Sequence, residues 1–501
     1  MKESALRENS SHDVPLVSPS SLRDFLALSY SELEEINLEM KKLATSGKSE
    51  DFLKDKVLKY LQSEKRIKAV TVGFSDIEGR FHMLDYDKKY FLSSYDNLTF
   101  DGSSIVGFSA QMQSDLRLAP DWGTFRILPA DIFGPGKILM FSFVLNQNGS
   151  PYAADFRGRL KMLTMELQKK EGYTVNMAPE IEGFAFEGID AEQNFSSAHG
   201  FKLATRGGYF YALPQDRLRK FIDTVAEAQR AMGFENEKDH GEVAPSQFEI
   251  NFKYTDVLTA CDEIQLYKLT ARQVAKLMEM TASFLPKPVM GINGSGMHTN
   301  MSISKNGKNA FYSATQMNAI SDVAHRFITG ILHYAKDLCL VICPSVNSYR
   351  RLDPRFEAPN EIKMSPRDRG SMVRIPIGNE KSARIEVRSV APDANPYLTN
   401  FSLIHAGLLG IRSSDKEYAE MSKVLTKKPF PKLFGNIADA LRAFHKSKFM
   451  EYIMGEENHE KYYAIKKETA MRSPELLGIK VKTAEVIYHH EVRNQEIWKK
   501  F

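Results

Sequence analysis

The sequence predicts an α+β protein, and three segments carry this prediction. Residues 51–65 (DFLKDKVLKYLQSEK) predict a helix, and residues 67–87 predict a β-hairpin whose turn lies at Glu78-Gly79. Residues 157–173 predict a second helix that ends near Gly172, because glycine is favoured just after a helix. Strands and helices then alternate to the C-terminus, so a small α+β unit reaching about residue 150 precedes a larger one.

Length and composition place the chain among globular proteins and exclude disordered, collagen-like and disulfide-scaffold proteins. It has 501 residues, of which 43% are hydrophobic and 26% charged, and this length allows about two to four domains. We expect a polar, poorly ordered extension over residues 1–50, an N-terminal domain over residues 51–150 and a larger domain over residues 151–501. Residues 33–44 loosely follow helical spacing, so this stretch is also a candidate partner-binding helix.

Charge and apolar patterning exclude several classes of partner. Lys and Arg number 67 and Asp and Glu 63, a net charge of +4, without the basic module typical of nucleic-acid binding. No apolar run approaches the roughly 18 residues that cross a bilayer, and the first residues lack the apolar core of a secretory signal. We expect a cytoplasmic protein that binds neither nucleic acid nor membrane. Cys261, Cys339 and Cys343 form no CxxC pair and predict reduced, structural thiols.

Two pairs of glutamates are candidate metal ligands. Glu180 and Glu182 lie two residues apart in a predicted strand (APEIEGFAF), so their side chains leave from the same face. Glu242 and Glu249 lie seven apart, and they can face one cavity only if Pro245-Ser246 folds the segment into a hairpin. Taken alone, each pair is more typical of a solvated surface than of a functional site.

A glycine-rich loop and an arginine-rich strand supply the remaining candidates. The loop, Asn293 to Gly296, precedes a strand in which His298, Asn300 and Ser302 share one face, and its glycines let backbone approach a ligand closely. The segment RIEVR places Arg384, Glu386 and Arg388 on one face. Further cations upstream are Arg351, Arg369, Arg374 and Lys381.

The whole set indicates chemistry that none of its parts indicates alone. Five glutamates and one histidine form an almost all-oxygen ligand set, which favours Mg²⁺ or Mn²⁺ over zinc or copper. Hard divalent ions beside several arginines suit phosphoryl transfer from a nucleotide. The chain has no GxxxxGK[ST] loop and no HRD or DFG signature, so we infer a nucleotide site built on a sheet of carboxylates and arginines.

These residues resemble the type I, bacterial-type, glutamine synthetase family from about residue 65 onward. The matching stretches, in chain order, are FDGSSIVGF, SDLRLAPDWGTFRILP, APEIEGFAF, RGGYF, HGEVAPSQFEI, FLPKPVMGINGSGMH, NSYRRLDPRFEAP, VRIP, ARIEVR and DANPYL. The resemblance implies an N-terminal β-grasp domain and a C-terminal catalytic domain with a curved antiparallel sheet. It also implies a dodecamer of two stacked hexameric rings, with each site between neighbouring subunits.

The resemblance assigns roles to individual positions. It implies two or more metal ions per site, one held by Glu182, Glu242 and Glu249 and another by Glu180, His298 and Glu386. Glutamate would be held by Asn293, Gly294, Arg351 and Arg388. ATP would be held by Glu237, Tyr254, Ser302, Arg374, Lys381 and Arg384. The catalytic residues would be Asp101, Glu357 and Arg369.

The implied reaction joins glutamate and ammonium at the expense of ATP, through γ-glutamyl phosphate. Asp101 of a neighbouring subunit would bind ammonium and take its proton, and Glu357 would close the site against water. Two alternatives remain: a γ-glutamyl ligase for an organic amine or polyamine, and a catalytically idle structural or regulatory relative. Retention of Asp101 and Glu357 favours ammonium, and all six metal-ligand positions being present opposes the idle relative.

The chain departs from the family pattern at several positions. Arg355 replaces the usual glycine of the flap that carries Glu357, and Asn300 replaces the second histidine of an HxH pattern. Smaller departures are Gly183, Met364 and the stretch Asp368-Arg369-Gly370. Residues 423–436 (KVLTKKPFPKLFGN) lack the tyrosine that many type I enzymes carry for adenylylation, so we expect no such regulation. The Pro429–Pro431 stretch departs from the usual inter-subunit loop.

Overall fold

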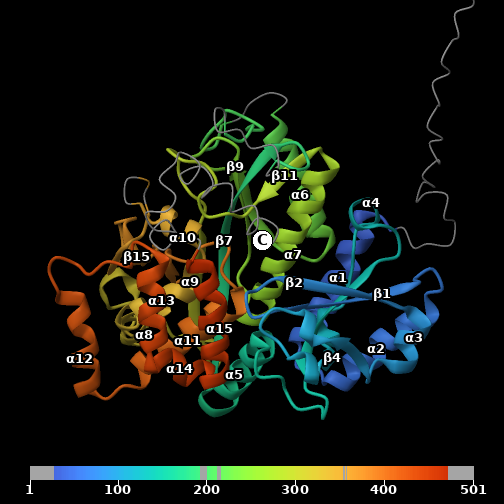
Figure 1. The fold of residues 1–501 in the computed structure, drawn as a ribbon, viewed down its shortest axis with the longest axis horizontal. Coiled ribbons are helices and arrows are strands. Elements are labelled where there is room, and N and C mark those ends of the chain that lie inside the picture. Colours follow the sequence, from blue (N-terminus) through green and yellow to red (C-terminus); the bar gives the residue numbers. More distant parts are fainter. Residues whose placement is uncertain (1–27, 192–199, 212–215, 354–355, 357, 472–501) are drawn as a thin grey trace, which may run out of the picture.

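The computed structural model describes residues 28–191, 200–211, 216–353, 356 and 358–471, and these residues form two packed units. In Figure 1 the N-terminal unit, blue to teal, lies on the right, and the C-terminal helices, orange to red, lie on the left. The long strand β7 and helix α7 run between them. None of the described helices is both long and apolar enough to cross a membrane.

The N-terminal unit is built on a six-stranded sheet of order β2-β1-β6-β4-β3, with β5 paired to β6. The predicted hairpin over residues 67–87 is confirmed, because β1 and β2 pair antiparallel with Ser75 opposite Phe81. Strands β1 and β6 pair in parallel at the centre. The strands are β1 (Ala69–Ser75), β2 (Phe81–Asp87), β3 (Leu98–Asp101), β4 (Asp115–Pro120), β5 (Arg126–Ile127) and β6 (Ile138–Leu145).

Helix α2 (Glu50–Ser63) confirms the helix predicted over residues 51–65. Its first turn is capped by the Ser49 side chain, and Leu53, Val57 and Leu61 recur every four residues on the buried face. This unit matches the expected β-grasp domain. Its other helices are α3 (Lys88–Ser94), α4 (Ala130–Phe133) and the short 3-10 helices η2 (Gly102–Ser104), η3 (Gln111–Gln113) and η4 (Trp122–Thr124).

Helix α1 (Tyr30–Thr45) lies where we expected part of a poorly ordered extension, and the structure differs from that expectation for this stretch. The helix begins at Ser29 with a capping box and buries Leu33, Asn37 and Met40. The apolar residues at helical spacing form a packed helix here because they are buried against α6, β5 and η4 of the same chain. Residues 1–27, the rest of the expected extension, lie outside the described residues.

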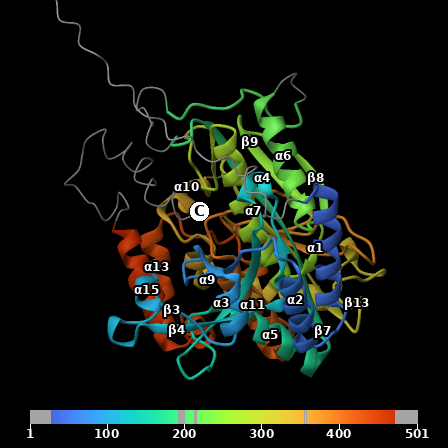
Figure 2. The same cartoon turned by 90° about the vertical axis from the view of Figure 1, so that its right-hand side faces the viewer.

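Asn37 fixes α1 between the two units. Its side-chain amide donates to the carbonyl oxygens of Ile127 (2.9 Å) and Ala231 (2.8 Å), and its side-chain oxygen accepts from the Ile127 amide (2.9 Å). Ile127 lies on β5 and Ala231 ends α6 (Arg217–Ala231), so one buried amide connects both units. Figure 2 shows α1 and α6 on the same side of the molecule.

The second unit is built on a ten-stranded, curved and mostly antiparallel sheet of order β14-β15-β16-β12-β7-β9-β8. Strands β10 and β11 also pair with β7, and β13 pairs with β12. The strands are β7 (Tyr173–Glu187), β8 (Asn236–Gly241), β9 (Gln247–Phe252), β10 (Thr255–Asp256), β11 (Met280–Ser283), β12 (Met297–Lys305), β13 (Lys308–Asn309), β14 (Glu361–Ser365), β15 (Ser371–Arg374) and β16 (Ile385–Val387).

Helices pack against this sheet and bury one continuous apolar core. The helix predicted over residues 157–173 is confirmed as α5 (Phe156–Glu171), which ends at Gly172 with a φ of 69°. The others are α7 (Val257–Leu277), α8 (Asp322–His333), α9 (Ala335–Ile342), α10 (Val346–Arg351), α11 (Pro396–Arg412), α12 (Asp415–Thr426), α13 (Ile437–Lys446), α14 (Lys448–Met454), α15 (Glu456–Ala470) and the 3-10 helix η5 (Met317–Ala319).

The turn between β1 and β2 anchors the N-terminal unit in the C-terminal one. Gly79 has a φ of 90°, and a Cβ there would lie 2.6 Å from the Asn395 Cα, so only glycine fits. Gln265 donates to the Gly79 carbonyl at 2.9 Å, and Lys466 pairs with Glu78 at 2.8 Å in a buried setting. The relative position of the units is thereby set by specific polar contacts.

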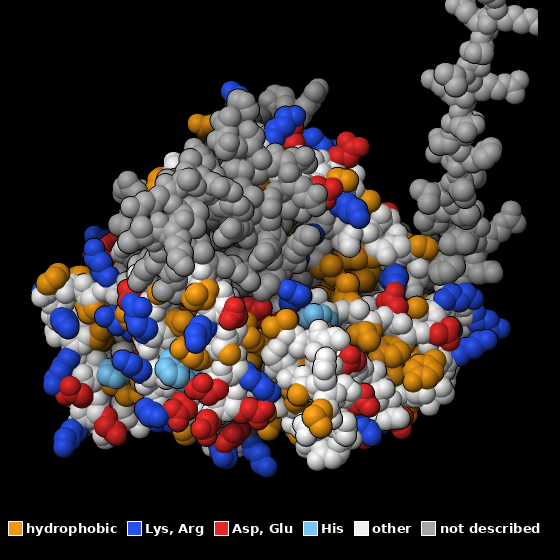
Figure 3. All heavy atoms as spheres, viewed as in Figure 1, with side chains coloured by type: hydrophobic (Ala, Val, Ile, Leu, Met, Phe, Trp, Pro, Cys, Tyr) orange, Lys and Arg blue, Asp and Glu red, His pale blue; other side chains and the backbone are white. Residues whose placement is uncertain are grey.

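Charged side chains of both signs are spread over the face shown in Figure 3, in keeping with the small net charge. The three cysteines are buried and unpaired, as expected. Buried charged side chains, in contrast, gather on one face of the ten-stranded sheet.

Candidate functional site

Adjacent strands of the large sheet place acidic and histidine side chains opposite one another. Glu180 on β7 lies opposite His298 on β12, and Glu182 lies opposite Glu249 on β9. Directly opposed residues of antiparallel strands point to the same face. The prediction that Glu180 and Glu182 share a face is confirmed, and strand pairing brings His298 and Glu249 to that face.

The hairpin predicted around Pro245-Ser246 is also confirmed. Ser246 has a φ of 62°, and the Glu242 amide donates to the Gln247 carbonyl at 2.8 Å, which closes the turn between β8 and β9. Glu242 and Glu249 therefore line the same cavity despite their odd spacing.

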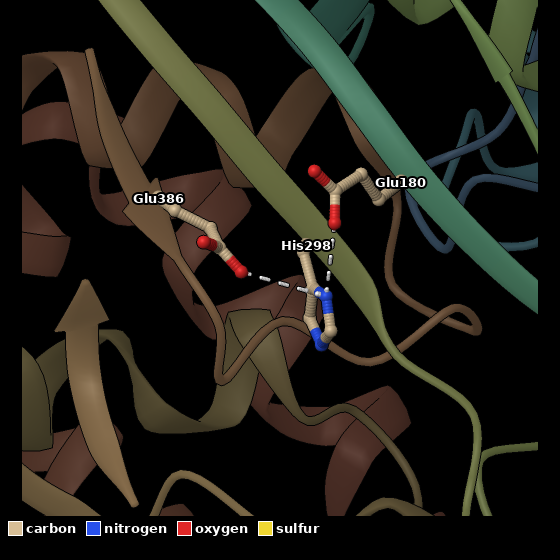
Figure 4. A group of neighbouring side chains, drawn as sticks. All are labelled: Glu180, His298 and Glu386. Carbon is tan, nitrogen blue, oxygen red and sulfur yellow. Dashed lines mark ion pairs between the residues drawn. The ribbon is translucent and has the colours of Figure 1, made fainter. Parts of the chain in front are cut away.

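One group of possible metal donors consists of Glu180, His298 and Glu386, whose ligand atoms lie within 4.8 Å of one another. The three side chains point toward one another from β7, β12 and β16 (Figure 4). His298 Nδ1 lies 3.5 Å from a Glu180 oxygen and 3.7 Å from a Glu386 oxygen. Glu386 also accepts a hydrogen bond from Arg388 Nη1 at 2.6 Å and pairs with Arg374.

The second group consists of His240, Glu242 and Glu249. His240 Nδ1 lies 3.6 Å from Glu242 and its Nε2 lies 3.7 Å from Glu249. Glu182 lies beside Glu249 and accepts from the Gly296 amide at 2.9 Å, so one of its oxygens is already oriented.

Several buried carboxylates lie close together at this site, and burial and their neighbours shift their pKa values. Burial and, next in size, the neighbouring charge of Glu182 together raise the pKa of Glu242 to about 7. Burial and the charges of Glu182, Glu180 and Glu242 raise the pKa of Glu249 well above its usual range. Burial also raises the pKa of Glu180, but hydrogen bonds and charge from His298 and a hydrogen bond from Asn300 lower it to about 2.

This donor set fits hard divalent cations. Carboxylate oxygens predominate, with one imidazole in each group, which suits Mg²⁺ or Mn²⁺ better than the sulfur-preferring ions. Burial first, and then the charge of Glu182, raise the pKa of both Glu242 and Glu249, and a bound cation would stabilise their ionised forms.

Members of both groups, all but Glu386, line a cavity of about 260 Å³ whose walls are rich in arginine. Arg351 is buried and donates to the carbonyls of Arg388 (2.8 Å), Ser389 (3.2 Å) and Val390 (3.2 Å). Arg388 keeps a buried Nε without a partner among the described residues. The residues predicted to bind glutamate or to catalyse that line this cavity are Asn293, Gly294, Arg351, Arg369 and Arg388.

The glycine-rich loop lies against this cavity because larger residues would not fit. A Cβ at Gly296 would lie 2.6 Å from the His298 ring and 2.7 Å from the Arg351 guanidinium. A Cβ at Gly294 would lie 2.4 Å from the Pro286 carbonyl oxygen. The two glycines thus allow backbone to pass directly beside a predicted metal ligand and a predicted carboxylate-binding arginine.

A second cavity, of about 390 Å³, adjoins the first on the same face of the sheet. Both cavities are lined by Glu180, Lys238 and Arg384. Tyr254 is 54% exposed at the second cavity, so its ring is available for stacking. The predicted nucleotide-binding residues that line it are Glu237, Tyr254, Ser302, Lys381 and Arg384, while Arg374 lines the first cavity.

Asp101, a predicted catalytic residue, lines neither cavity of its own chain. Asp101 is exposed at the end of β3 and accepts from the Ser103 amide (2.8 Å) and the Ser104 hydroxyl (2.9 Å). Glu357 lies outside the described residues, as does Arg355, so the altered flap stays a prediction.

Two side chains at the site, His240 and Lys238, are absent from the sequence prediction. His240 precedes Glu242 by two residues and Lys238 precedes His240 by two, so strand alternation was the available signal. Alternation assigns these side chains to the site only when the positions of the bulge before Lys238 and of the hairpin at Ser246 are known. The exposed aromatic pair Tyr209 and Phe210 also lines the metal-donor cavity.

The structure explains two of the departures from the family pattern. The ring of Phe248 occupies the space beside Gly183, where a Cβ would lie 2.6 Å from the ring. Asn300 donates to Glu180 at 3.0 Å and accepts from Arg384 Nε at 3.0 Å, so it links a predicted metal ligand to a predicted phosphate ligand. Met364 packs at the edge of the core.

Comparison with known proteins covers both units. Residues 66–147 match the family model described as glutamine synthetase, beta-Grasp domain, and residues 153–476 match the model described as glutamine synthetase, catalytic domain. A curated glutamine synthetase of Staphylococcus aureus is 37% identical over 367 residues, 73% of this chain and 81% of the relative. One from Staphylococcus epidermidis is 37% identical over 364 residues, 72% and 80% of the two chains.

Solved structures show the same fold. A cryo-electron-microscopy structure of Plasmodium falciparum glutamine synthetase superimposes with a TM-score of 0.74 at 23% identity, covering 87% of this chain and 98% of that one. A structure titled "GmaS/ADP complex-Conformation 1" superimposes with a TM-score of 0.70 at 25% identity, covering 82% and 95%.

Proposed function

The chain belongs to the glutamine synthetase family, and from that premise we propose that it ligates ammonium to glutamate, with ATP as co-substrate and γ-glutamyl phosphate as intermediate. The γ-carboxylate attacks the γ-phosphorus of ATP, and ADP leaves. Ammonia then attacks the acyl carbon and displaces phosphate, giving glutamine.

One observation carries the proposal: the cavity that members of both metal-donor groups line and the second cavity share Glu180, Lys238 and Arg384. A phosphate donor in the second cavity is therefore adjacent to an acceptor carboxylate in the first. Positioning of this kind, with electrostatic stabilisation, supplies most of the catalysis in phosphoryl transfer.

Arginines in the first cavity would bind the acceptor and the transferred group. Arg351 and Arg388 would hold the carboxylates of glutamate, and Arg388 has a buried Nε available for this. Asn293 and Gly294 would receive its amino end. Arg369 lines the same cavity and would neutralise the phosphoryl group during transfer.

Two sets of donors would hold divalent cations, Mg²⁺ or Mn²⁺. Glu182, Glu242 and Glu249 form one set, and His240 lies beside it. Glu180, His298 and Glu386 form the other. When bound, such ions neutralise charge on the phosphates and orient them for in-line displacement. The side chains of Glu237, Tyr254, Ser302, Arg374, Lys381 and Arg384 would bind the rest of ATP.

The ammonium step would need a second subunit. Asp101 is exposed and lines neither cavity of its own chain, which supports a site completed by a neighbour's Asp101 in a homo-oligomer of stacked hexameric rings. Asp101 would bind ammonium and accept its proton, while Glu357 would exclude water. Hydrogen bonds from Ser103 and Ser104 lower the pKa of Asp101, which keeps it anionic and suited to binding a cation.

A second candidate function is ligation of glutamate to an organic amine. Tyr209, Phe210 and Val243 are exposed apolar side chains that line the metal-donor cavity, and such a wall suits an alkyl amine. The carboxylate, metal and nucleotide residues would keep the same roles, and only the acceptor would differ.

The test is phosphate release with ATP, Mg²⁺ and glutamate, with ammonium, methylamine, putrescine or no acceptor. Ammonium-dependent release with glutamine identified by mass spectrometry supports the proposal. Release only with an organic amine moves the function to the second candidate. Absence of turnover with every acceptor, in folded and oligomeric protein, contradicts both and favours an idle relative. The Glu249→Gln variant provides the matched inactive control.

A further inference from the structure

Lys238 on strand β8 directly follows an irregularity in the pairing of that strand with β9. Asn236 lies opposite Phe252, but Lys238 lies opposite Asn251, so Glu237 is an extra residue in the strand. A bulge of this kind redirects the side chains beside it. Glu237 and Lys238 consequently line the same nucleotide-type cavity although they are adjacent in sequence.

After the bulge, the register aligns Lys238 with the metal-donor face. His240 lies opposite Glu249, as Lys238 lies opposite Asn251, and residues two apart in a strand share a face. Lys238 therefore stands on the same side of the sheet as His240, and it lines both cavities.

The Lys238 ammonium is available for a ligand. It makes no hydrogen bond or ion pair with the residues that the structure describes, and its side chain is exposed. Two arginines of the cavity walls are engaged: Arg374 pairs with Glu386, and Arg384 donates to Asn300 and to the Ser382 carbonyl. Lys238 thus supplies a positive charge, without a partner among the described residues, at the junction of the cavities.

We propose that Lys238 is an additional phosphate-binding residue, whose ammonium contacts the polyphosphate of a bound nucleotide at the junction of the two cavities, which Glu180 and Arg384 also line. The inference deepens the proposed function and rests on it, because the second cavity must hold a nucleotide. A lysine suits this place, since its point charge on a flexible stem follows phosphate oxygens as they move.

A competing role is electrostatic compensation of the acidic group alone. Burial raises the pKa of Glu180, and His298, Asn300 and the charge of Lys238 lower it. If compensation were the whole role, removing Lys238 would alter divalent-cation binding and would not distinguish a nucleoside from its diphosphate. The two roles are therefore separable by the choice of ligand.

The experiment is calorimetric titration of the full-length protein, saturated with Mg²⁺, with ADP and separately with adenosine. For Lys238→Ala we expect the Kd for ADP to rise about 10- to 100-fold, the range for loss of a charge-assisted contact, with the adenosine Kd unchanged. Lys238→Arg should recover part of the ADP affinity. Lys220→Ala, on the exposed side of α6, removes the same charge away from both cavities and should bind ADP as the unmodified protein does.

Three outcomes overturn the inference. If Lys238→Ala binds ADP as tightly as the unmodified protein does, Lys238 does not contact the phosphates. If electron paramagnetic resonance shows that Lys238→Ala weakens Mn²⁺ binding while its ADP affinity is unchanged, Lys238 only compensates the acidic charge. If the unmodified protein does not bind ADP, the proposed function is contradicted as well. In steady-state kinetics, a raised KM for ATP at constant KM for glutamate is the supporting pattern.

Discussion

Glu182 on β7 and Glu249 on β9 lie directly opposite each other on one face of the sheet, with 9% and 5% of the two residues exposed. Two buried carboxylates in register repel each other unless a proton or a cation intervenes. The fold therefore holds this pair in an arrangement that its own charges oppose, and a divalent cation is the natural counter-charge.

The first prediction concerns pH and metal. Burial raises the pKa of Glu242 from 4.5 to about 7, so below pH 4.5 folded and unfolded chains both hold the proton. As pH rises toward about 7, the unfolded chain loses the proton first, and the metal-free fold loses stability. The melting temperature of metal-free protein should fall across this window, and Mg²⁺ should restore it because metal binding releases the protons.

Glu242→Gln is the matched control for this pH dependence. It removes the titrating group, so its metal-free melting temperature should vary less between pH 4.5 and about 7. A metal-free melting temperature that rises with pH in the unmodified protein would contradict the assigned direction of the pKa.

The second prediction concerns His240, which lies 3.6 Å from Glu242 and 3.7 Å from Glu249. We expect His240→Ala to weaken Mn²⁺ binding about 10- to 100-fold, as loss of a ligand or of its supporting partner usually does. His333→Ala, at the exposed end of α8, is the control. Unchanged Mn²⁺ titrations for His240→Ala would exclude a metal-related role.

The third prediction concerns Asn300, which connects Glu180 to Arg384 by two 3.0 Å hydrogen bonds. Asn300→Ala leaves both partners without this link, and we expect the KM for ATP to rise about 10-fold. Asn148→Ala, in the exposed turn after β6, should leave the KM unchanged. Steady-state kinetics at saturating glutamate measures the effect, and an unaltered KM for ATP would refute it.

The fourth prediction concerns helix α1. Asn37→Ala removes three hydrogen bonds to backbone groups of Ile127 and Ala231, so we expect a loss of about 1–3 kcal/mol in the free energy of unfolding. Glu35→Ala, on the exposed face of the same helix, should change it by less than about 0.5 kcal/mol. Urea denaturation compares them, and equal midpoints would mean that α1 contributes little to the fold.

The fifth prediction concerns the neighbour's contribution to the site. Asp101→Asn and Glu249→Gln variants should each be inactive in the ammonium reaction, because each lacks one part of a shared site. When the two are dissociated and reassembled together, about a quarter of the sites should combine both intact parts and regain activity. Absence of any recovery, in protein shown by native mass spectrometry to be mixed, would place Asp101 outside the site.

The sequence alone determined much of the local structure and the family. Helix α2 and the β1–β2 hairpin follow from apolar spacing and turn residues, which depend only on neighbouring residues. The shared face of Glu180 and Glu182 follows from strand alternation. Ordered motifs with unusual residues sufficed to identify the family, because several long matches in sequence do not coincide by chance.

Only the tertiary structure decided which separate segments meet. Strand pairing brought His240 to Glu249 and His298 to Glu180, and a bulge in β8 turned Lys238 toward the nucleotide-type cavity. Helix α1 packs against β5 and α6, which are distant from it in sequence. The polar composition of residues 1–50 therefore did not predict that part of this stretch is a packed helix. Local spacing shows which face a side chain occupies, but charge, burial and ligand geometry depend on partners that folding brings together.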